Sequence, residues 1–143
     1  MKFFLSRTQR ELIEEVLRKY PDKEKEYQRL DKTISDLCRP PSISQIGGSG
    51  LIISSSEPER IAEAKESNKE YKWLEHYLEI VRGGMRRLSG QERKIISLFY
   101  WEGLTNLEVA EEVNLEERYC RKIRNRALYK LGQVFIPHFL AQK

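Results

Sequence analysis

The sequence has few of the residues that build metal sites, disulfide frameworks or structural loops. Among its 143 residues are 2 Cys and 2 His, each isolated in the chain, and no C-x-x-C motif. Structural zinc usually takes four Cys or His ligands, so we expect neither a zinc site nor a disulfide framework. The content of 8 Gly and 5 Pro excludes collagen-like and proline-rich low-complexity classes.

Long apolar runs are also missing. A transmembrane helix needs about 20 largely apolar residues, so we expect no membrane span. The chain begins MKFFLSRTQRELIEE, which soon turns charged and has no small-residue cleavage site. A secretory signal needs a longer apolar region, so we expect a protein of the cytoplasm. Asp is scarce and no nucleophile–base grouping is visible, so we expect no enzyme, catalytic residue, cofactor or small-molecule ligand.

The net charge of +4 is modest, but it is distributed unevenly along the chain. Residues 1–82 carry 15 Lys or Arg and 15 Asp or Glu, whereas residues 83–143 carry 11 and 7. Within the second part, residues 118–130 read RYCRKIRNRALYK, with six basic residues and no acidic one. A basic helix in an otherwise balanced chain favours a polyanionic partner, although charge alone fits a solvated surface equally well.

Helical periodicity covers almost the whole sequence and predicts an all-α protein. Residues 1–38 hold two apolar stretches separated by Pro21, which is expected to stop or kink the helix because it has no N–H to donate. Residues 58–88 carry a seam with steps of three and four, which predicts one long pairing helix with a hinge at Gly83-Gly84. The apolar positions are Leu12, Ile13, Val16, Leu17, Tyr20, Tyr27, Leu30, Ile34, Leu37, Tyr71, Leu74, Leu78, Val81, Met85 and Leu88.

The apolar positions of residues 1–38 and of residues 58–88 allow two kinds of pairing. Residues 24–38 can pack on residues 58–88 as an intramolecular hairpin, or the long helix can form a coiled coil with a second copy. The pattern favours the hairpin, with homodimerisation through the same or a neighbouring surface. Residues 39–57 are rich in Ser and Gly and predict a linker or loop. Their glycine cluster lacks the Lys-Ser/Thr that a P-loop needs, so no nucleotide site is expected.

Residues 89–131 have the pattern of a helix-turn-helix domain. Capping boxes at Ser89–Glu92 and Thr105–Glu108 predict two helix starts. Asn114 can adopt the left-handed conformation of a tight turn, and a third helix is expected over residues 117–131. Small and apolar residues occupy the positions that such a motif buries, namely Val109, Ala110, Val113, Leu115, Cys120 and Ile123.

The helix predicted over residues 117–131 has two different sides when it is laid out at about 100° per residue. The side of Cys120, Ile123, Ala127 and Leu131 is expected to pack on the domain. The opposite side, with Arg121 and Arg126 on its flanks, is expected to be free for DNA and consists of Arg118, Lys122, Asn125 and Tyr129. Because Arg and Lys donate to guanine and Asn pairs with adenine, the predicted base contacts are Arg118, Lys122 and Asn125. Glu117 could accept from cytosine, although its simpler role is interaction with the helix dipole. The predicted phosphate contacts are Thr105, Arg126 and Lys130. Residues 132–143 are predicted to be a C-terminal apolar tail.

With these residues in view, Leu88 to Leu131 resembles region four of bacterial sigma factors. The pieces that carry the resemblance are Leu88-Ser89, Glu92-Arg93, Gly103-Leu104-Thr105, Glu108-Val109-Ala110-Glu111 and Arg126-Ala127-Leu128. The resemblance implies a recognition helix whose base-contacting positions fall on Glu117, Arg118, Arg121 and Lys122. Asn114 stands where a turn glycine is usual and Glu116 where Ser or Thr caps the helix, so a promoter sequence is not implied.

The whole layout is similar to phage late-transcription regulators of the RinA/ArpU type. That resemblance implies a homodimeric, sequence-specific double-stranded-DNA-binding activator of packaging and morphogenesis genes, which acts beside the RNA polymerase of the bacterial host. Two alternatives remain. A small-terminase-like DNA-packaging protein would form a closed ring of many subunits, and a protein-only polymerase or sigma adaptor would show no salt-dependent affinity for DNA. A full sigma factor is disfavoured because no second basic, aromatic-rich domain is present.

Overall fold

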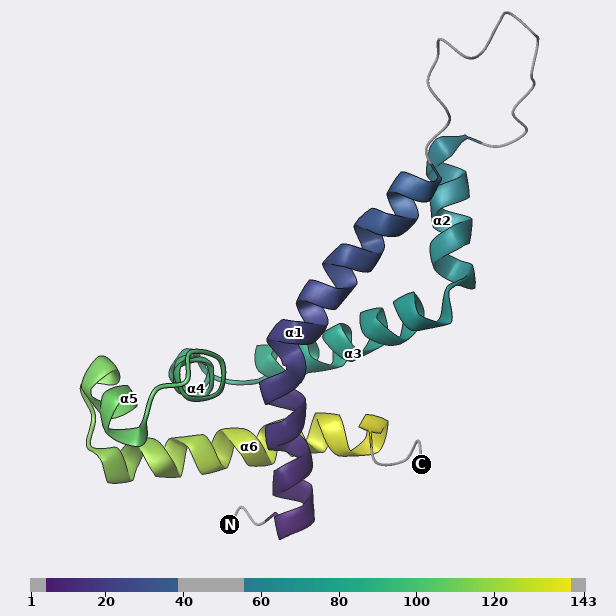
Figure 1. The fold of residues 1–143 in the computed structure, drawn as a ribbon. Coiled ribbons are helices and arrows are strands. Elements are labelled where there is room, and N and C mark those ends of the chain that lie inside the picture. Colours follow the sequence, from purple (N-terminus) through teal and green to yellow (C-terminus); the bar gives the residue numbers. More distant parts are fainter. Residues whose placement is uncertain (1–4, 39–55, 140–143) are drawn as a thin grey trace, which may run out of the picture. The chain divides into compact units, whose positions relative to one another are not determined.

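The computed structural model describes residues 5–38 and 56–139, and all regular structure in these ranges is helical. The predicted all-α class is therefore confirmed. The linker predicted over residues 39–57 lies outside the described residues, except that Ser56 and Glu57 begin the second helix. The elements are α1 (Arg7–Leu37), α2 (Glu57–Ser67), α3 (Lys69–Arg86), α4 (Gly90–Ile96), the π-helical segment η2 (Ser97–Trp101), α5 (Asn106–Val113) and α6 (Glu117–Phe139) (Figure 1).

These helices form two compact units. The first unit comprises residues 5–22 and 77–139, and the second comprises residues 23–38 and 56–76. The helices α1 and α3 contribute residues to both units. None of the helices in the described ranges is long and apolar enough to cross a bilayer.

The core of the first unit lies where α1, α3 and α6 meet. Its largest fully buried side chains include Ile13, Leu17, Leu78, Val81, Leu131 and Phe135. A Cβ atom added at Gly84 would lie 2.9 Å from both Leu131 Cδ2 and Phe135 Cε1, so only glycine lets α3 and α6 approach this closely. The Gly83-Gly84 pair predicted as a hinge is instead part of continuous helix, in which Gly84 serves packing.

The helix α1 continues through Pro21, so the predicted stop at that residue is wrong. Proline has no N–H, which leaves the Leu17 carbonyl without its helical donor. Trp101 Nε1 donates to this carbonyl at 2.8 Å, and the Trp101 ring stacks on Tyr20 with their centroids 5.0 Å apart. A side chain from η2 thus satisfies the backbone group that Pro21 leaves without a partner.

The predicted long helix over residues 58–88 is divided into α2 and α3 at Asn68, so its continuity was wrong. Asn68 has an extended backbone with φ −88° and ψ 110°. Its side-chain oxygen accepts a hydrogen bond from the Tyr71 backbone N–H at 2.9 Å. Asn is among the best N-cap residues, so Asn68 ends one helix and begins the next.

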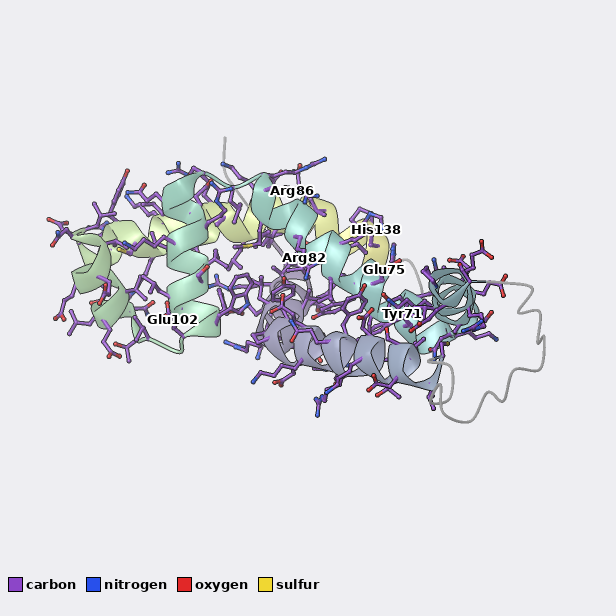
Figure 2. All side chains as sticks on the ribbon, turned by 90° about the horizontal axis from the view of Figure 1, so that it is seen from above. Tyr71, Glu75, Arg82, Arg86, Glu102 and His138 are labelled. Atoms are coloured by element: carbon purple, nitrogen blue, oxygen red, sulfur yellow. The ribbon has the colours of Figure 1, made fainter. Side chains whose placement is uncertain are left out.

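Polar contacts join α1 to α2 and α3 in the second unit. The hydroxyls of Tyr27 and Tyr71 lie 2.7 Å apart, and the Tyr71 hydroxyl also donates to Asp31 at 3.0 Å. Lys65 on α2 forms a 2.7 Å ion pair with the same Asp31 carboxylate. Figure 2 shows Tyr71 and Glu75 on neighbouring turns of α3. These contacts confirm the intramolecular pairing predicted for this part of the chain.

Few apolar side chains support the second unit. Only Ile34, Tyr71 and Leu74 are buried apolar residues within its described part, and α2 has no buried residue. Leu37, which the seam pattern placed on the pairing face, is 80% exposed. The second unit is therefore held by hydrogen bonds and ion pairs over a small apolar contact.

The helix α6 extends to Phe139, whereas the sequence predicted its end at Leu131. The predicted apolar tail is therefore helical over residues 132–139, and residues 140–143 lie outside the described part. Phe135 is fully buried, and the rings of Phe139 and Tyr77 approach to 5.3 Å between centroids. Burial of these aromatic side chains against the other helices stabilises the additional turns.

Candidate nucleic-acid interface

Both predicted capping boxes are present at the starts of α4 and α5. The Glu92 backbone N–H donates to the Ser89 hydroxyl at 3.2 Å, and the Ser89 N–H donates to the Glu92 carboxylate at 2.8 Å. The corresponding distances between Thr105 and Glu108 are 3.2 and 3.0 Å. These bonds fix where each short helix begins.

A tight turn joins α5 to α6. Asn114 adopts φ 55° and ψ 45°, the left-handed conformation that its residue type predicted. The Leu115 N–H donates to the Ala110 carbonyl at 3.1 Å, which closes the end of α5. Three residues therefore separate the last residue of α5 from Glu117, the first residue of α6.

A single apolar cluster holds α4, η2, α5 and α6 together. All six positions predicted to be buried belong to it, four of them buried and two partly buried, and this part of the prediction is confirmed. The cluster consists of Ile95, Leu98, Val109, Ala110, Cys120 and Ile123, with Phe99, Leu104, Val113 and Leu115 packed against it. Burial raises the pKa of the Cys120 thiol, and the charge of Glu117 adds to the effect, so the thiol stays neutral.

The buried side of α6 is the predicted one, whereas Tyr129, predicted on the free side, is partly buried and has a partner. Cys120, Ile123, Ala127 and Leu131 are buried. On the other side, a group of side chains is exposed and has no ion pair or side-chain hydrogen bond within the described residues. We call this group the α6 face; it consists of Arg118, Lys122, Asn125 and Arg126. A row of three cations and one amide on a rigid helix is suited to bind a polyanion, and Asn125 adds a donor–acceptor pair.

Two further predicted base contacts are engaged with each other. Arg121 forms an ion pair and hydrogen bond with Glu117, one turn earlier on α6. The side chain of Arg121 remains 55% exposed and that of Glu117 37%. The first turn of α6 therefore presents a neutral pair, beside the unpaired cations of the α6 face. A contact of either residue with a base stays a prediction.

The predicted phosphate contacts Thr105 and Lys130 have structural partners. Thr105 caps α5 through the bonds described above, and Lys130 Nζ lies 2.8 Å from Glu92 Oε1. The Glu92 side chain is only 2% exposed, whereas that of Lys130 is 38% exposed. Burial acts to raise the pKa of Glu92, but the bonds from Lys130 and Ser89 outweigh it and hold the pKa below its usual value. Lys130 thus joins α6 to α4, and its phosphate role stays a prediction.

Sequence reasoning missed Arg124 as an orienting residue. Its guanidinium lies 4.2 Å from the centroid of the Phe99 ring and donates to the Asn106 side-chain oxygen in the first turn of α5. Burial lowers its pKa, which is consistent with a half-buried cation between helices. The sequence did contain a signal for this role, because Arg124 lies four residues after Cys120 and therefore at the edge of the buried side of the helix. Arg124 fixes α6 against α5 and η2.

The α6 face lies on a helix whose orientation is fixed by side-chain contacts with two neighbouring helices. Arg124 joins the helix to α5, and Lys130 joins it to α4. No group of three or more His, Cys, Asp or Glu within residues 5–38 and 56–139 could hold a metal ion. What the arrangement offers is a positioned set of cations and one amide.

Comparison with known proteins gives a family and one curated relative. The chain is 28% identical over 68 residues to the RNA polymerase sigma-G factor of Bacillus subtilis (strain 168). The match covers 48% of this chain and 25% of that protein, so the chain corresponds to about a quarter of the relative's length. No solved structure matches the chain. Residues 10–133 match the family model DUF722, described as a protein of unknown function, and the chain belongs to that family.

Proposed function

We propose that this protein is a sequence-specific, double-stranded-DNA-binding transcription regulator. The α6 helix is the recognition helix of a helix-turn-helix and lies in the major groove of its operator or promoter site. The observation that carries the proposal is the α6 face, whose exposed cations and amide have no partner in the part of the chain that the structure describes, while the opposite side of the helix is buried. A helix of this kind fits the major groove and presents donors to base edges.

The likeness to a sigma factor supports a role in transcription. The curated relative is an RNA polymerase sigma factor. Independently of that match, the motifs of residues 88–131 resemble the sigma region that reads promoter DNA. We infer that the protein acts with host RNA polymerase as an activator of phage late genes, as regulators of the RinA/ArpU type do. This finer assignment rests on the resemblance in layout.

The second unit supports a homodimer. Leu37 is 80% exposed and Trp73 is 45% exposed, whereas the buried apolar contact in the described part of this unit is small. Pairing of two copies would remove these side chains from water at about 25 cal/mol per Å² of apolar surface. A dimer also matches the two-fold symmetry of most helix-turn-helix operators.

Titration of a selected DNA site tests the proposal. The full chain is first used to select its site from a random duplex library, and binding to this site and to a scrambled duplex is then measured at several salt concentrations. We expect the selected site to bind at least a hundredfold more tightly. Lys122→Ala should weaken the selected site by about 1–3 kcal/mol and change scrambled binding little, because base contacts discriminate while phosphate contacts do not.

Lys19→Ala is the matched control, because Lys19 is also an exposed lysine on a helix but pairs with Glu15 at 2.7 Å. This variant should bind both duplexes like the wild type. Equal binding of the two duplexes by the wild type would contradict sequence-specific recognition, and a closed ring by mass measurement would then favour a DNA-packaging protein. Absence of DNA binding at low salt would favour the protein-only adaptor.

A further inference from the structure

A second group of cations that have no partner within residues 5–38 and 56–139 lies on α1, far in sequence from the α6 face. Lys25, Arg29 and Lys32 follow one another at steps of four and three, which places them on one side of the helix. With Gln28 they line a shallow surface hollow in the second unit. We call these four residues the α1 stripe. It spans seven helical steps, or about 10 Å at 1.5 Å per residue.

The charges of the α1 stripe are not neutralised within the described residues, unlike the cations earlier on the same helix. Those earlier cations all pair with carboxylates, in the pairs Arg7–Glu11, Arg10–Glu14, Arg18–Glu14, Lys19–Glu15 and Lys23–Glu26. No hydrogen bond or ion pair of the side chains of Lys25, Arg29 or Lys32 occurs in the described part of the chain. The contrast separates this stripe from an ordinary solvated helix surface.

Two of the nearby carboxylates are used elsewhere. Asp31 lies on another side of α1, where Lys65 binds it at 2.7 Å and the Tyr71 hydroxyl at 3.0 Å. Asp36 lies one turn beyond Lys32 on the same side, but it is engaged by another group and marks the end of the stripe. A run of cations with no apolar residue among them has the chemistry of a contact for a polyanion.

We propose that the α1 stripe is a second DNA contact, which binds the sugar-phosphate backbone outside the site that α6 reads. The proposal rests on the DNA-binding function proposed above. Duplex DNA presents one negative charge per about 1.7 Å of axis, so about 10 Å of duplex offers roughly six phosphates to the three cations. Contacts of this kind add affinity for any sequence and release counterions, while α6 supplies the discrimination between sequences.

The test compares two duplexes and two triple variants of the full chain. One duplex holds only the selected site, and the other extends the same site by about two helical turns on each side. The first variant is K25Q/R29Q/K32Q. The control is R7Q/K19Q/K72Q, which removes the same charge from exposed cations that have carboxylate partners. Helix content and melting temperature establish that both variants fold.

On the extended duplex, we compare the slopes of the logarithm of the binding constant against the logarithm of the salt concentration. The slope of K25Q/R29Q/K32Q should be smaller in magnitude than that of the wild type by two to three units, at about 0.9 unit per phosphate. The affinity of the wild type should then rise about 40-fold more than that of the variant between 0.2 and 0.05 M salt. On the short duplex the two proteins should bind alike, and the control should follow the wild type on both.

Equal slopes for all three proteins on the extended duplex would overturn the proposal while leaving sequence-specific binding by α6 intact. Equal losses on the short and extended duplexes would also overturn it, because the stripe would then not contact flanking DNA. Failure of the wild type to bind any duplex would overturn both this proposal and the proposed function. The outcomes therefore separate the two claims.

Discussion

The two compact units differ in what holds them together. In the first unit, the helices meet over a continuous set of fully buried apolar side chains, and glycines at positions 84 and 132 permit close approach. The second unit has three buried apolar residues in its described part and relies on Tyr27, Asp31, Lys65 and Tyr71 for its contacts. Apolar burial is worth about 25 cal/mol per Å², whereas a hydrogen bond contributes about 1 kcal/mol net.

This difference in packing suits different roles for the two units. The recognition role that we propose for α6 requires a rigidly held helix, and α6 is fixed by its apolar side and by Arg124 and Lys130. A small polar unit opens more readily, and its structure is more easily changed by a partner or by a second copy. The first unit should therefore protect its amides from exchange more strongly than the second.

The largest effect is expected from Leu78→Asp in the core of the first unit. Leu78 is 1% exposed, so the substitution would bury an unpaired carboxylate and cost about 3 kcal/mol or more in the free energy of unfolding. Urea unfolding followed by circular dichroism measures this loss. The matched substitution in the second unit is Leu37→Asp, at a side chain that is 80% exposed in the single chain, and at protein concentrations low enough to keep the chain monomeric it should change stability by less than about 0.5 kcal/mol. At concentrations at which the proposed homodimer forms, the same substitution should cost more, because the second copy would then cover Leu37.

A smaller effect is expected from Lys130→Met, which removes the partner of buried Glu92. Breaking a buried pair costs several kcal/mol, but Lys130 is partly exposed, so we expect about 2 kcal/mol at pH 7. Because the folded-state pKa of Glu92 lies below its unfolded value, its contribution is complete above the unfolded pKa and is lost as the pH falls through the folded one. The difference in the free energy of unfolding between the wild type and Lys130→Met should therefore decrease in acid. Lys94→Met, at an exposed residue of α4, should show no such difference at any pH.

The smallest effect is expected from Tyr71→Phe in the second unit. The substitution keeps the ring that stacks on Tyr27 at 4.9 Å and removes the hydroxyl bonds to Tyr27 and Asp31. Burial, with the bonds to Tyr27 and Asp31, raises the pKa of Tyr71, so this hydroxyl stays protonated at neutral pH. We expect a loss of about 1 kcal/mol, seen by hydrogen exchange as faster opening of α2 and of its neighbours in the second unit. Equal acceleration in α4 to α6 would show that the two units unfold together.

Local signals in the sequence predicted the parts of the fold that depend on a few neighbouring residues. The capping boxes at Ser89 and Thr105, the left-handed Asn114 and the buried side of α6 were all confirmed. Each follows from the chemistry of residues three or four positions apart. The same periodicity also placed Leu78 and Val81 in the core.

Features that depend on distant residues could not be predicted in the same way. The continuity of α1 through Pro21 needs Trp101, which is 84 positions from the Leu17 carbonyl that it satisfies. The last turns of α6 depend on Phe135 packing near Gly84. The ion pair of Lys130 with Glu92 links α6 to α4, which are separate in sequence. Charge counting along α6 could not reveal this pair and therefore assigned Lys130 to the DNA surface.

Methylation interference on the selected site tests the central claim most directly. Dimethyl sulfate modifies guanine N7 in the major groove and adenine N3 in the minor groove, and only the major groove displays the donor and acceptor pattern that α6 would read. We predict that N7 methylation of guanines within the site blocks binding, that N3 methylation of adenines does not, and that Lys122→Ala removes the interference at particular guanines. Interference confined to adenine N3, or none at any base, would contradict recognition by α6 in the major groove.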